Sequence, residues 1–267
     1  MSTRRDFLSA AVVAAVSGAA TKSWSQEPTT DAHADLMKGW HGDEEIAMVV
    51  YDGFTALDLF GPHHMFILMN GAKINLVSAT LDPVATDGTQ IQPTMTFDDC
   101  PDDLTVLFVP GGSSGTLNAM KNDVIVDFLA DRGKKAEWIA SVCTGSLLLG
   151  AAGLLDGYKA TSHWLSREVL AEFGATPVNE RVVVDRNRIT GAGVTAGIDL
   201  GLSLAGKFRG DAYAQGCQLF AEYDPAPPYD AGSEEKAPAA ITAMLRGMHT
   251  SFNDSALAIA KSRRGRK

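Results

Sequence analysis

Short apolar runs alternate with longer amphipathic stretches along most of this chain. Runs rich in Val, Ile and Leu are typical of strands buried on both faces of a parallel sheet, whereas a 3.6-residue apolar period indicates helices. The resulting order, strand then helix several times over, favours an α/β fold with a mostly parallel central sheet. The sequence predicts strands over residues 46–51, 73–78, 104–109, 138–142, 181–185 and 188–190, and a small β-hairpin within 82–96. It predicts helices over 63–69 (entered through Gly61-Pro62), 122–135 (capped by Asp123), 145–155, 166–173, 195–208, 211–223 and 239–260.

The first 25 residues read as an export signal rather than as part of the fold. Arg4-Arg5 precedes Phe7-Leu8 and a short apolar run over 9–20, an order that resembles the twin-arginine export signal of bacteria. A disordered amphipathic terminus is the alternative. The signal predicts a periplasmic protein, with a polar linker over 26–43. No later stretch is long and apolar enough to serve as a stable membrane anchor.

The net negative charge of the chain argues against a nucleic-acid partner. The chain of 267 residues has a net charge of −9, and the last seven residues hold five positive charges, which leaves −14 for the rest. Phosphate contacts need clustered Lys and Arg, so we expect no nucleic-acid partner. The basic tail is expected to be a solvated chain end.

Cysteine and histidine spacing argues against metal sites and disulfide frameworks. Cys100, Cys143 and Cys217 form no CxxC pair, and three cysteines leave one unpaired. The histidines show no metal-ligand spacing. His163, beside Trp164, is expected to bond a buried backbone group; a place near a cysteine is the alternative.

Cys143 is the candidate nucleophile. A predicted strand runs directly into it, and Thr144-Gly145 opens the next helix, so the side chain is expected on a sharp, exposed elbow. The positive end of that helix is expected to lower the thiol pKa. A buried structural cysteine is the alternative, and it is the interpretation we give Cys100 and Cys217.

Two further features lie where strands end. Pro110-Gly111-Gly112 follows the strand at 104–109, and its backbone N–H groups could bind a developing negative charge beside Cys143. Asp58, between Leu57 and Leu59, could hold a proton near neutral pH if apolar burial raises its pKa. The alternative role for Asp58 is a helix N-cap.

Taken together, these segments resemble the ThiJ/PfpI superfamily, which is related to class I glutamine amidotransferases, and within it the isonitrile hydratase branch. The resemblance implies a flavodoxin-like three-layer sandwich, a homodimer, and a family domain over 44–233 followed by a helical extension with a basic tail over 234–267. It implies that Cys143 is the nucleophile, Asp58 its acidic partner and Thr144 an assisting residue, with Gly112 and the Thr144 backbone as an oxyanion-type hole. The segments that carry the resemblance are 58–62 (DLFGP), 109–112 (VPGG), 141–155 (SVCTGSLLLGAAGLL), 160–164 (ATSHW), 186–191 (RNRITG), 193–199 (GVTAGID) and 222–228 (EYDPAPP).

The expected reaction is addition of water to a small-molecule isonitrile through a Cys143 thioimidate, giving an N-substituted formamide without a metal or organic cofactor. Peptidase-like relatives carry His after the cysteine, where this chain has Thr144. AraC-type regulators append DNA-binding helices, for which the 34 residues after Ser233 are too few. Two alternatives stay open: a non-catalytic periplasmic module that senses a ligand or oxidant, and a glyoxalase-type thiol hydrolase.

Overall fold

The computed structural model describes residues 37–264. The predicted export signal over 1–25 and most of the predicted linker lie outside the described residues. In the described range, no helix combines the length and the apolar character needed to cross a membrane.

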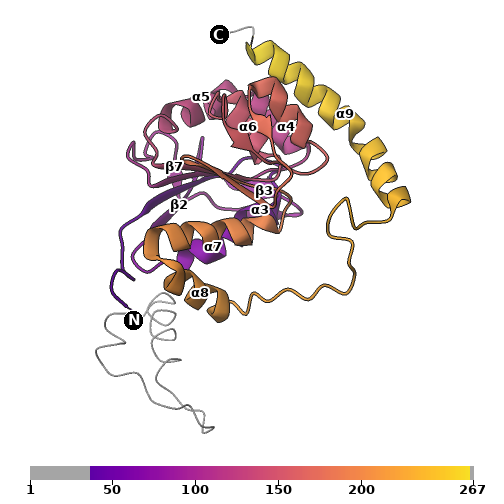
Figure 1. Ribbon diagram of the computed structural model, residues 1–267. Coiled ribbons are helices and arrows are strands. Elements are labelled where there is room, and N and C mark those ends of the chain that lie inside the picture. Colours follow the sequence, from indigo (N-terminus) through magenta and orange to yellow (C-terminus); the bar gives the residue numbers. More distant parts are fainter. Residues whose placement is uncertain (1–36, 265–267) are drawn as a thin grey trace.

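A seven-stranded sheet forms the centre of the molecule (Figure 1). Its spatial order is β10-β11-β7-β6-β1-β2-β5, and every neighbouring pair is parallel except the edge hairpin β10–β11. The middle strands are almost completely buried, as their uninterrupted apolar sequences require. The strands of this sheet are β1 (Glu45–Val49), β2 (Lys73–Ser78), β5 (Met95–Thr96), β6 (Val106–Val109), β7 (Trp138–Val142), β10 (Val182–Asp185) and β11 (Arg188–Gly191). Two small sheets pair β3 (Val84–Thr86) with β4 (Thr89–Ile91), and β8 (Lys159–Ala160) with β9 (Thr176–Pro177).

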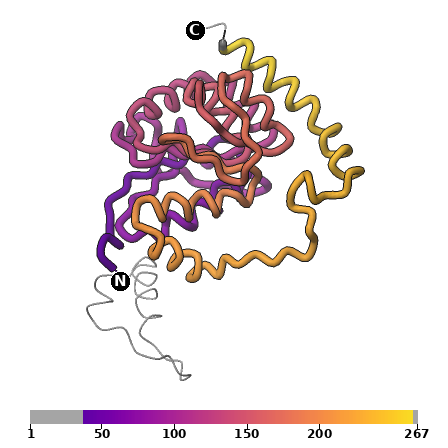
Figure 2. Tube along the Cα trace, viewed as in Figure 1, coloured from indigo at the N-terminus to yellow at the C-terminus, as the bar shows by residue number. Residues whose placement is uncertain are grey.

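Helices cover both faces of the sheet and complete three layers (Figure 1). One face carries α3 (Ala56–Ile67), α7 (Ala196–Arg209) and α8 (Asp211–Phe220). The other carries α4 (Ser114–Lys121), α5 (Asp123–Arg132), α6 (Gly145–Ala151), the 3-10 helix η1 (Arg167–Phe173) and α9 (Ala239–Arg264). An extended segment leaves α8, crosses the side of the molecule and leads into α9 (Figure 2).

Close packing of α3 on α7 depends on small residues. A methyl group added at Gly197 would lie 2.7 Å from Cδ of Pro62, and one at Gly201 would lie 2.7 Å from Cβ of Met65. These glycines let the two helix backbones approach, so the proline sits inside α3 with its ring packed against α7. The layer that carries Asp58 is therefore fixed by backbone proximity.

The predicted three-layer α/β fold is confirmed, and so are the strands at 73–78 and 138–142, residue for residue. Other expectations were wrong in detail. The first helix begins at Ala56, well before Gly61-Pro62. The cap of α5 is Asn122, whose side chain accepts the Val124 N–H, while Asp123 is the first helical residue. The predicted helix at 166–173 is a 3-10 helix that ends at the left-handed Gly174, and α4 was not predicted at all.

Candidate active site

Cys143 lies on a strained elbow between β7 and α6. Its φ is +57°, in the left-handed region that few non-glycine residues adopt. The turn is possible because Gly145 follows: a methyl group there would lie 2.3 Å from the Val109 carbonyl oxygen. The Cys143 N–H donates to the Gly191 carbonyl (3.0 Å), which fixes the elbow to β11. Such strain at a strand end is typical of nucleophiles held for attack.

The thiol itself is more buried and more basic than the sequence predicts. Cys143 is only 7% exposed, and burial together with the nearby Asp58 carboxylate raises the pKa of its thiol well above 9.0. The Thr144 backbone N–H opposes this rise, as expected for a helix N-terminus. The expected lowering of the thiol pKa was therefore wrong, because desolvation outweighs the peptide dipoles. Burial therefore favours the thiol over the thiolate, and a base beside Cys143 is needed to take its proton and make the sulfur nucleophilic.

Asp58 can take that proton. It lies fully buried in the first turn of α3, and its Oδ2 accepts the Gly111 N–H at 3.1 Å. Burial raises the pKa of its carboxyl to about 7, although the Cys143 thiol and the Gly111 N–H favour the ionised form. Its Oδ1 is buried without a well-formed hydrogen bond in the described chain. Asp58 and Cys143 thus form a coupled pair that can exchange a proton near neutral pH.

Asp58 does not act as a helix cap. Thr55 occupies the N-cap position of α3 and makes no side-chain cap bond. Instead, Oδ2 of Asp87 accepts the Ala56 N–H at 2.9 Å. Asp87 belongs to the hairpin β3–β4, and its charge also raises the pKa of Asp58. The hairpin therefore supplies the cap and leaves Asp58 free to face Cys143.

The Thr144 hydroxyl is the centre of a buried hydrogen-bond network. It donates to the Gly112 carbonyl (2.8 Å), accepts the Gly112 N–H (3.0 Å) and lies 2.9 Å from the Thr116 hydroxyl. Thr116 lies 3.2 Å from the hydroxyl of Tyr51, which donates to the Pro110 carbonyl at 2.7 Å. Sequence reasoning missed Thr116 and Tyr51, because α4 was not predicted and no linear motif marks either residue.

The loop between β6 and α4 contributes backbone groups that are already engaged. Gly111 donates to Asp58 and Gly112 donates to Thr144, so either donor would have to exchange its partner to reach a substrate. Gly111 must be a glycine, because a methyl group there would lie 2.6 Å from the Thr144 nitrogen and 2.9 Å from Asp58 Oδ2. The loop thus brings Asp58, Thr144 and Cys143 together.

The remaining candidates lie outside this centre or beside it. Nδ1 of His163 accepts the Leu165 N–H at 3.3 Å, and burial, reinforced by nearby His249, lowers the pKa of His163 to about 4. Cys100 and Cys217 are free and buried, and burial raises the pKa of both thiols. Among the described residues, no group of three or more His, Cys, Asp or Glu side chains could hold a metal ion.

Comparison with known proteins gives this site a family. The model of the DJ-1/PfpI family matches residues 44–207, which include Asp58, Gly112, Cys143 and Thr144. The chain belongs to the DJ-1/PfpI family. It is 44% identical to isonitrile hydratase of Pseudomonas putida over 198 residues, covering 74% of this chain and 86% of that protein. A crystal structure of a ThiJ/PfpI family protein from Pseudomonas syringae superposes with a TM-score of 0.84 at 52% identity, covering 90% of this chain and 98% of that one.

The family also contains proteins with other roles. This chain is 31% identical over 176 residues to the HTH-type transcriptional regulator GbdR of Pseudomonas aeruginosa, covering 62% of this chain and 47% of the regulator. Family membership therefore establishes the fold, and the 44% identity adds a likeness to an isonitrile hydratase, but neither establishes the reaction.

Proposed function

We propose that this protein is an isonitrile hydratase-like enzyme, a hydro-lyase with Cys143 as its nucleophile. The observation that carries the proposal is the buried pair of Cys143 and Asp58, in which the carboxyl has a pKa of about 7. A base with that pKa is half ionised at neutral pH, so it can accept a proton and return it within one cycle. The identity with the Pseudomonas putida enzyme supplies the substrate class.

In the first step, the Asp58 carboxylate takes the thiol proton and the Cys143 sulfur attacks the terminal carbon of R–N≡C. A C–S bond forms, the electron pair of one carbon–nitrogen π bond moves to the nitrogen, and the carbon keeps its own lone pair as an imidoyl anion. Asp58, now a carboxylic acid, delivers the proton to that carbon. The product is a thioimidate, R–N=CH–S–Cys143, and Asp58 is again ionised.

In the second step, ionised Asp58 takes a proton from water as the water oxygen attacks the thioimidate carbon, and it passes that proton to the nitrogen. The tetrahedral adduct collapses, the C–S bond breaks, and the sulfur recovers a proton through Asp58 as the carbonyl forms. One water and one isonitrile give one N-substituted formamide, R–NH–CHO. The reaction is redox-neutral, and thiol, carboxyl and water supply every proton it moves, so we propose that no cofactor takes part.

Thr144 and Gly112 assist in this proposal through backbone and hydroxyl contacts. The Thr144 N–H points toward the Cys143 sulfur and stabilises its anionic form. The Thr144 hydroxyl, paired with both Gly112 backbone groups, can hold the attacking water once its bond to the Gly112 carbonyl opens. When the hydroxyl turns toward the water, its bond from the Gly112 N–H opens as well, and that N–H can then stabilise the adduct.

Turnover of cyclohexyl isocyanide by the purified protein tests the proposal. We expect N-cyclohexylformamide from the wild type, and a loss of at least about 1,000-fold in kcat for Cys143→Ala, because removal of an essential nucleophile leaves only binding. Cys217→Ala, in a second buried thiol outside the site, is the matched control and keeps wild-type turnover. Equal rates for wild type and Cys143→Ala would end the proposal.

A sensing module is the second candidate, and the partial likeness to the regulator GbdR favours it. It predicts ligand-dependent thermal stabilisation without turnover of isonitriles, nitriles or α-ketoaldehydes. The same assays separate a glyoxalase-type hydrolase, which would form lactate from methylglyoxal without glutathione.

We also propose that the protein works as a periplasmic homodimer. Light scattering during size-exclusion chromatography checks the homodimer and should give twice the mass of one chain. Fractionation of bacteria that express the full chain checks the periplasmic location, and replacing Arg4-Arg5 by Lys-Lys should retain the protein in the cytoplasm.

A further inference from the structure

The backbone carbonyl of Cys143 is held from two directions. It accepts hydrogen bonds from the Ser146 and Ser162 hydroxyls, both at 3.1 Å, and both side chains are completely buried. Ser146 lies in α6 and moves with the elbow. Ser162 belongs to a separate segment, so it ties the Cys143 carbonyl to a part of the chain outside the elbow, as Gly191 does for the Cys143 N–H.

The segment that carries Ser162 has little regular structure of its own. Residues 161–166 lie between β8 and η1 as loop and turn. At its start, the Thr161 N–H donates to the Thr190 hydroxyl of β11 at 2.9 Å. Its far end, at Leu165 and Ser166, is bonded to helix α9, which is almost ninety residues further along the chain.

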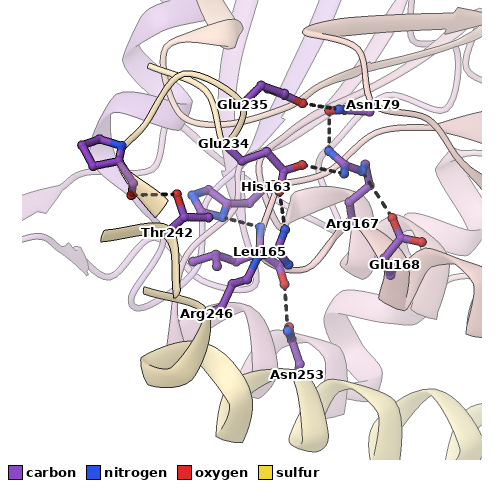
Figure 3. A network of polar contacts seen from close by, with 11 residues as sticks. His163, Leu165, Arg167, Glu168, Asn179, Glu234, Glu235, Thr242, Arg246 and Asn253 are labelled. Carbon is purple, nitrogen blue, oxygen red and sulfur yellow. Dashed lines mark hydrogen bonds and ion pairs between the residues drawn. The ribbon is translucent and has the colours of Figure 1, made fainter. Parts of the chain in front are cut away.

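Asn253 of α9 makes two hydrogen bonds with this end, one to Leu165 (Figure 3) and one to Ser166. Its Nδ2 donates to the Leu165 carbonyl at 2.7 Å, and its Oδ1 accepts the Ser166 hydroxyl proton at 2.8 Å. The Ser166 hydroxyl donates its only proton to Asn253, so its oxygen must accept a hydrogen bond from Nε2 of His249, at 2.8 Å. These three bonds fix both the backbone and the side chain at the end of the segment.

Charged and aromatic contacts hold the same part of the molecule to α9. Glu234 lies between Arg167 of η1, at 3.0 Å, and Arg246 of α9 (Figure 3). The Arg246 guanidinium also stacks over the Trp164 ring, 5.1 Å from its centre. Helix α9 therefore holds residues 164–167 by ionic and aromatic contacts in addition to the hydrogen bonds of Asn253 and His249.

Helix α9 also contacts the elements that lie beside Thr144. Nε of Arg263 donates to the Met120 carbonyl at 2.6 Å, and the guanidinium pairs with Asp123 at 2.8 Å, which ties α9 to α4 and α5. Helix α4 supplies Thr116, the neighbour of the Thr144 hydroxyl. One helix thus braces the two segments that contact Cys143 and Thr144.

We propose that Ser162 is a positioning residue for Cys143, and that α9 keeps it in place through Asn253 and His249. The C-terminal helix is then part of the catalytic apparatus without touching the substrate. The inference rests on the proposed function only for its kinetic effect, because the orientation of Cys143 can be measured without any turnover.

The test compares Ser162→Ala and Asn253→Ala with Ser255→Ala, a half-buried α9 residue whose hydroxyl bonds to the Ser251 carbonyl of its own helix. With cyclohexyl isocyanide we expect kcat to fall about 10- to 100-fold in the first two variants, with KM changed less than about threefold, because a misplaced nucleophile loses rate more than binding. Ser255→Ala should match the wild type. His249→Gln, whose amide can still donate to Ser166, should retain most of the activity that His249→Ala loses.

The rate of Cys143 alkylation by iodoacetamide, followed by mass spectrometry from pH 6 to 10, supplies the second readout. In Ser162→Ala and Asn253→Ala the profile should move to higher pH, because a reoriented elbow withdraws the Thr144 N–H from the sulfur. If both variants melt like the wild type and keep its alkylation profile, the inference is wrong. If the profile moves but the wild type hydrates no isonitrile, the positioning role stands and the proposed reaction fails.

Discussion

At the scale of single residues, burial raises the pKa of both Asp58 and Cys143, and the different extent of the two shifts gives the residues different parts in proton transfer. Desolvation raises the pKa of the carboxyl to about 7 and that of the thiol well above 9.0. The thiol is therefore the proton store at neutral pH and the carboxyl is the carrier. In the proposed reaction, this division lets a cysteine without a neighbouring cation react, because Asp58 removes its proton at the moment of attack.

The raised pKa of Asp58 predicts a pH effect on stability. The folded protein keeps this proton up to about pH 7, whereas the unfolded chain releases it near the ordinary carboxyl pKa of 3.8. Asp58 thus favours folding at low pH, and its contribution falls as pH rises from about 4 to 7, in total on the order of 4 kcal/mol. Asp58→Asn has no proton to release, so its free energy of unfolding should lack this fall.

Urea unfolding at pH 5, 6.5 and 8 measures the effect as the difference between wild type and variant, in which the other titrating groups largely cancel. The free energy of unfolding of the variant, relative to that of the wild type, should increase as the pH rises. Asn can still accept the Gly111 N–H, so the comparison isolates the charge. Parallel pH profiles for the two proteins would show that Asp58 titrates normally.

At the scale of secondary-structure elements, the sequence predicts what lies in continuous patterns and misses what other segments supply. The strands at 73–78 and 138–142 are apolar runs with clear boundaries, and the elbow at Cys143 follows from the second of them. Helix α4, with the sequence SGTLNAMK, has only eight residues and few strong helix formers. Its place is set by packing: a methyl group at Gly115 would lie 2.3 Å from the Gly53 carbonyl oxygen.

The part of the candidate site that the sequence could not predict depends on such packing. Cys143, Asp58, Thr144 and Gly112 lie close to one another, as the resemblance implies. The direction of the thiol pKa shift was missed because helix dipoles can be inferred from order along the chain, whereas the depth of burial cannot. Asp87 was missed as the cap of α3 because it comes from a hairpin thirty-one residues away from Ala56.

A substitution at Thr116 tests whether α4, the helix that the sequence did not predict, contributes to the reaction. Thr116→Val preserves shape and removes the hydroxyl between Tyr51 and Thr144. We expect kcat for cyclohexyl isocyanide to fall about 10-fold and stability to fall by about 1–3 kcal/mol, because the one hydroxyl proton that Thr116 can donate to Thr144 or Tyr51 is lost. Thr176→Val, at an exposed position of β9, serves as the matched control. Wild-type kinetics in Thr116→Val would show that the hydroxyl network plays no part in the reaction.

At the scale of the whole molecule, distant segments of the chain are tied together around the sheet. Helix α9 returns to bind residues 164–167 on one side. On the other, Arg209 at the end of α7 holds the start of β1 through Glu44 and also donates to the Asn70 carbonyl at 3.1 Å. These pairings join residues far apart in sequence, and residue periodicity carries no information about them.

The Arg209–Glu44 pair gives the last prediction. The Arg209 side chain is 2% exposed and that of Glu44 is 11% exposed, so each charge depends on the other for solvation. Arg209→Met should lower the free energy of unfolding by about 3–5 kcal/mol, because it leaves the Glu44 carboxylate buried and unpaired. The double variant Glu44→Leu/Arg209→Met removes both charges, and we expect it to recover most of that loss. Chemical unfolding of the wild type, both single variants and the double variant forms a complete cycle. A double variant as unstable as Arg209→Met alone would mean that the arginine acts through its packing and its bond to Asn70, since removal of the unpaired carboxylate would then have changed nothing.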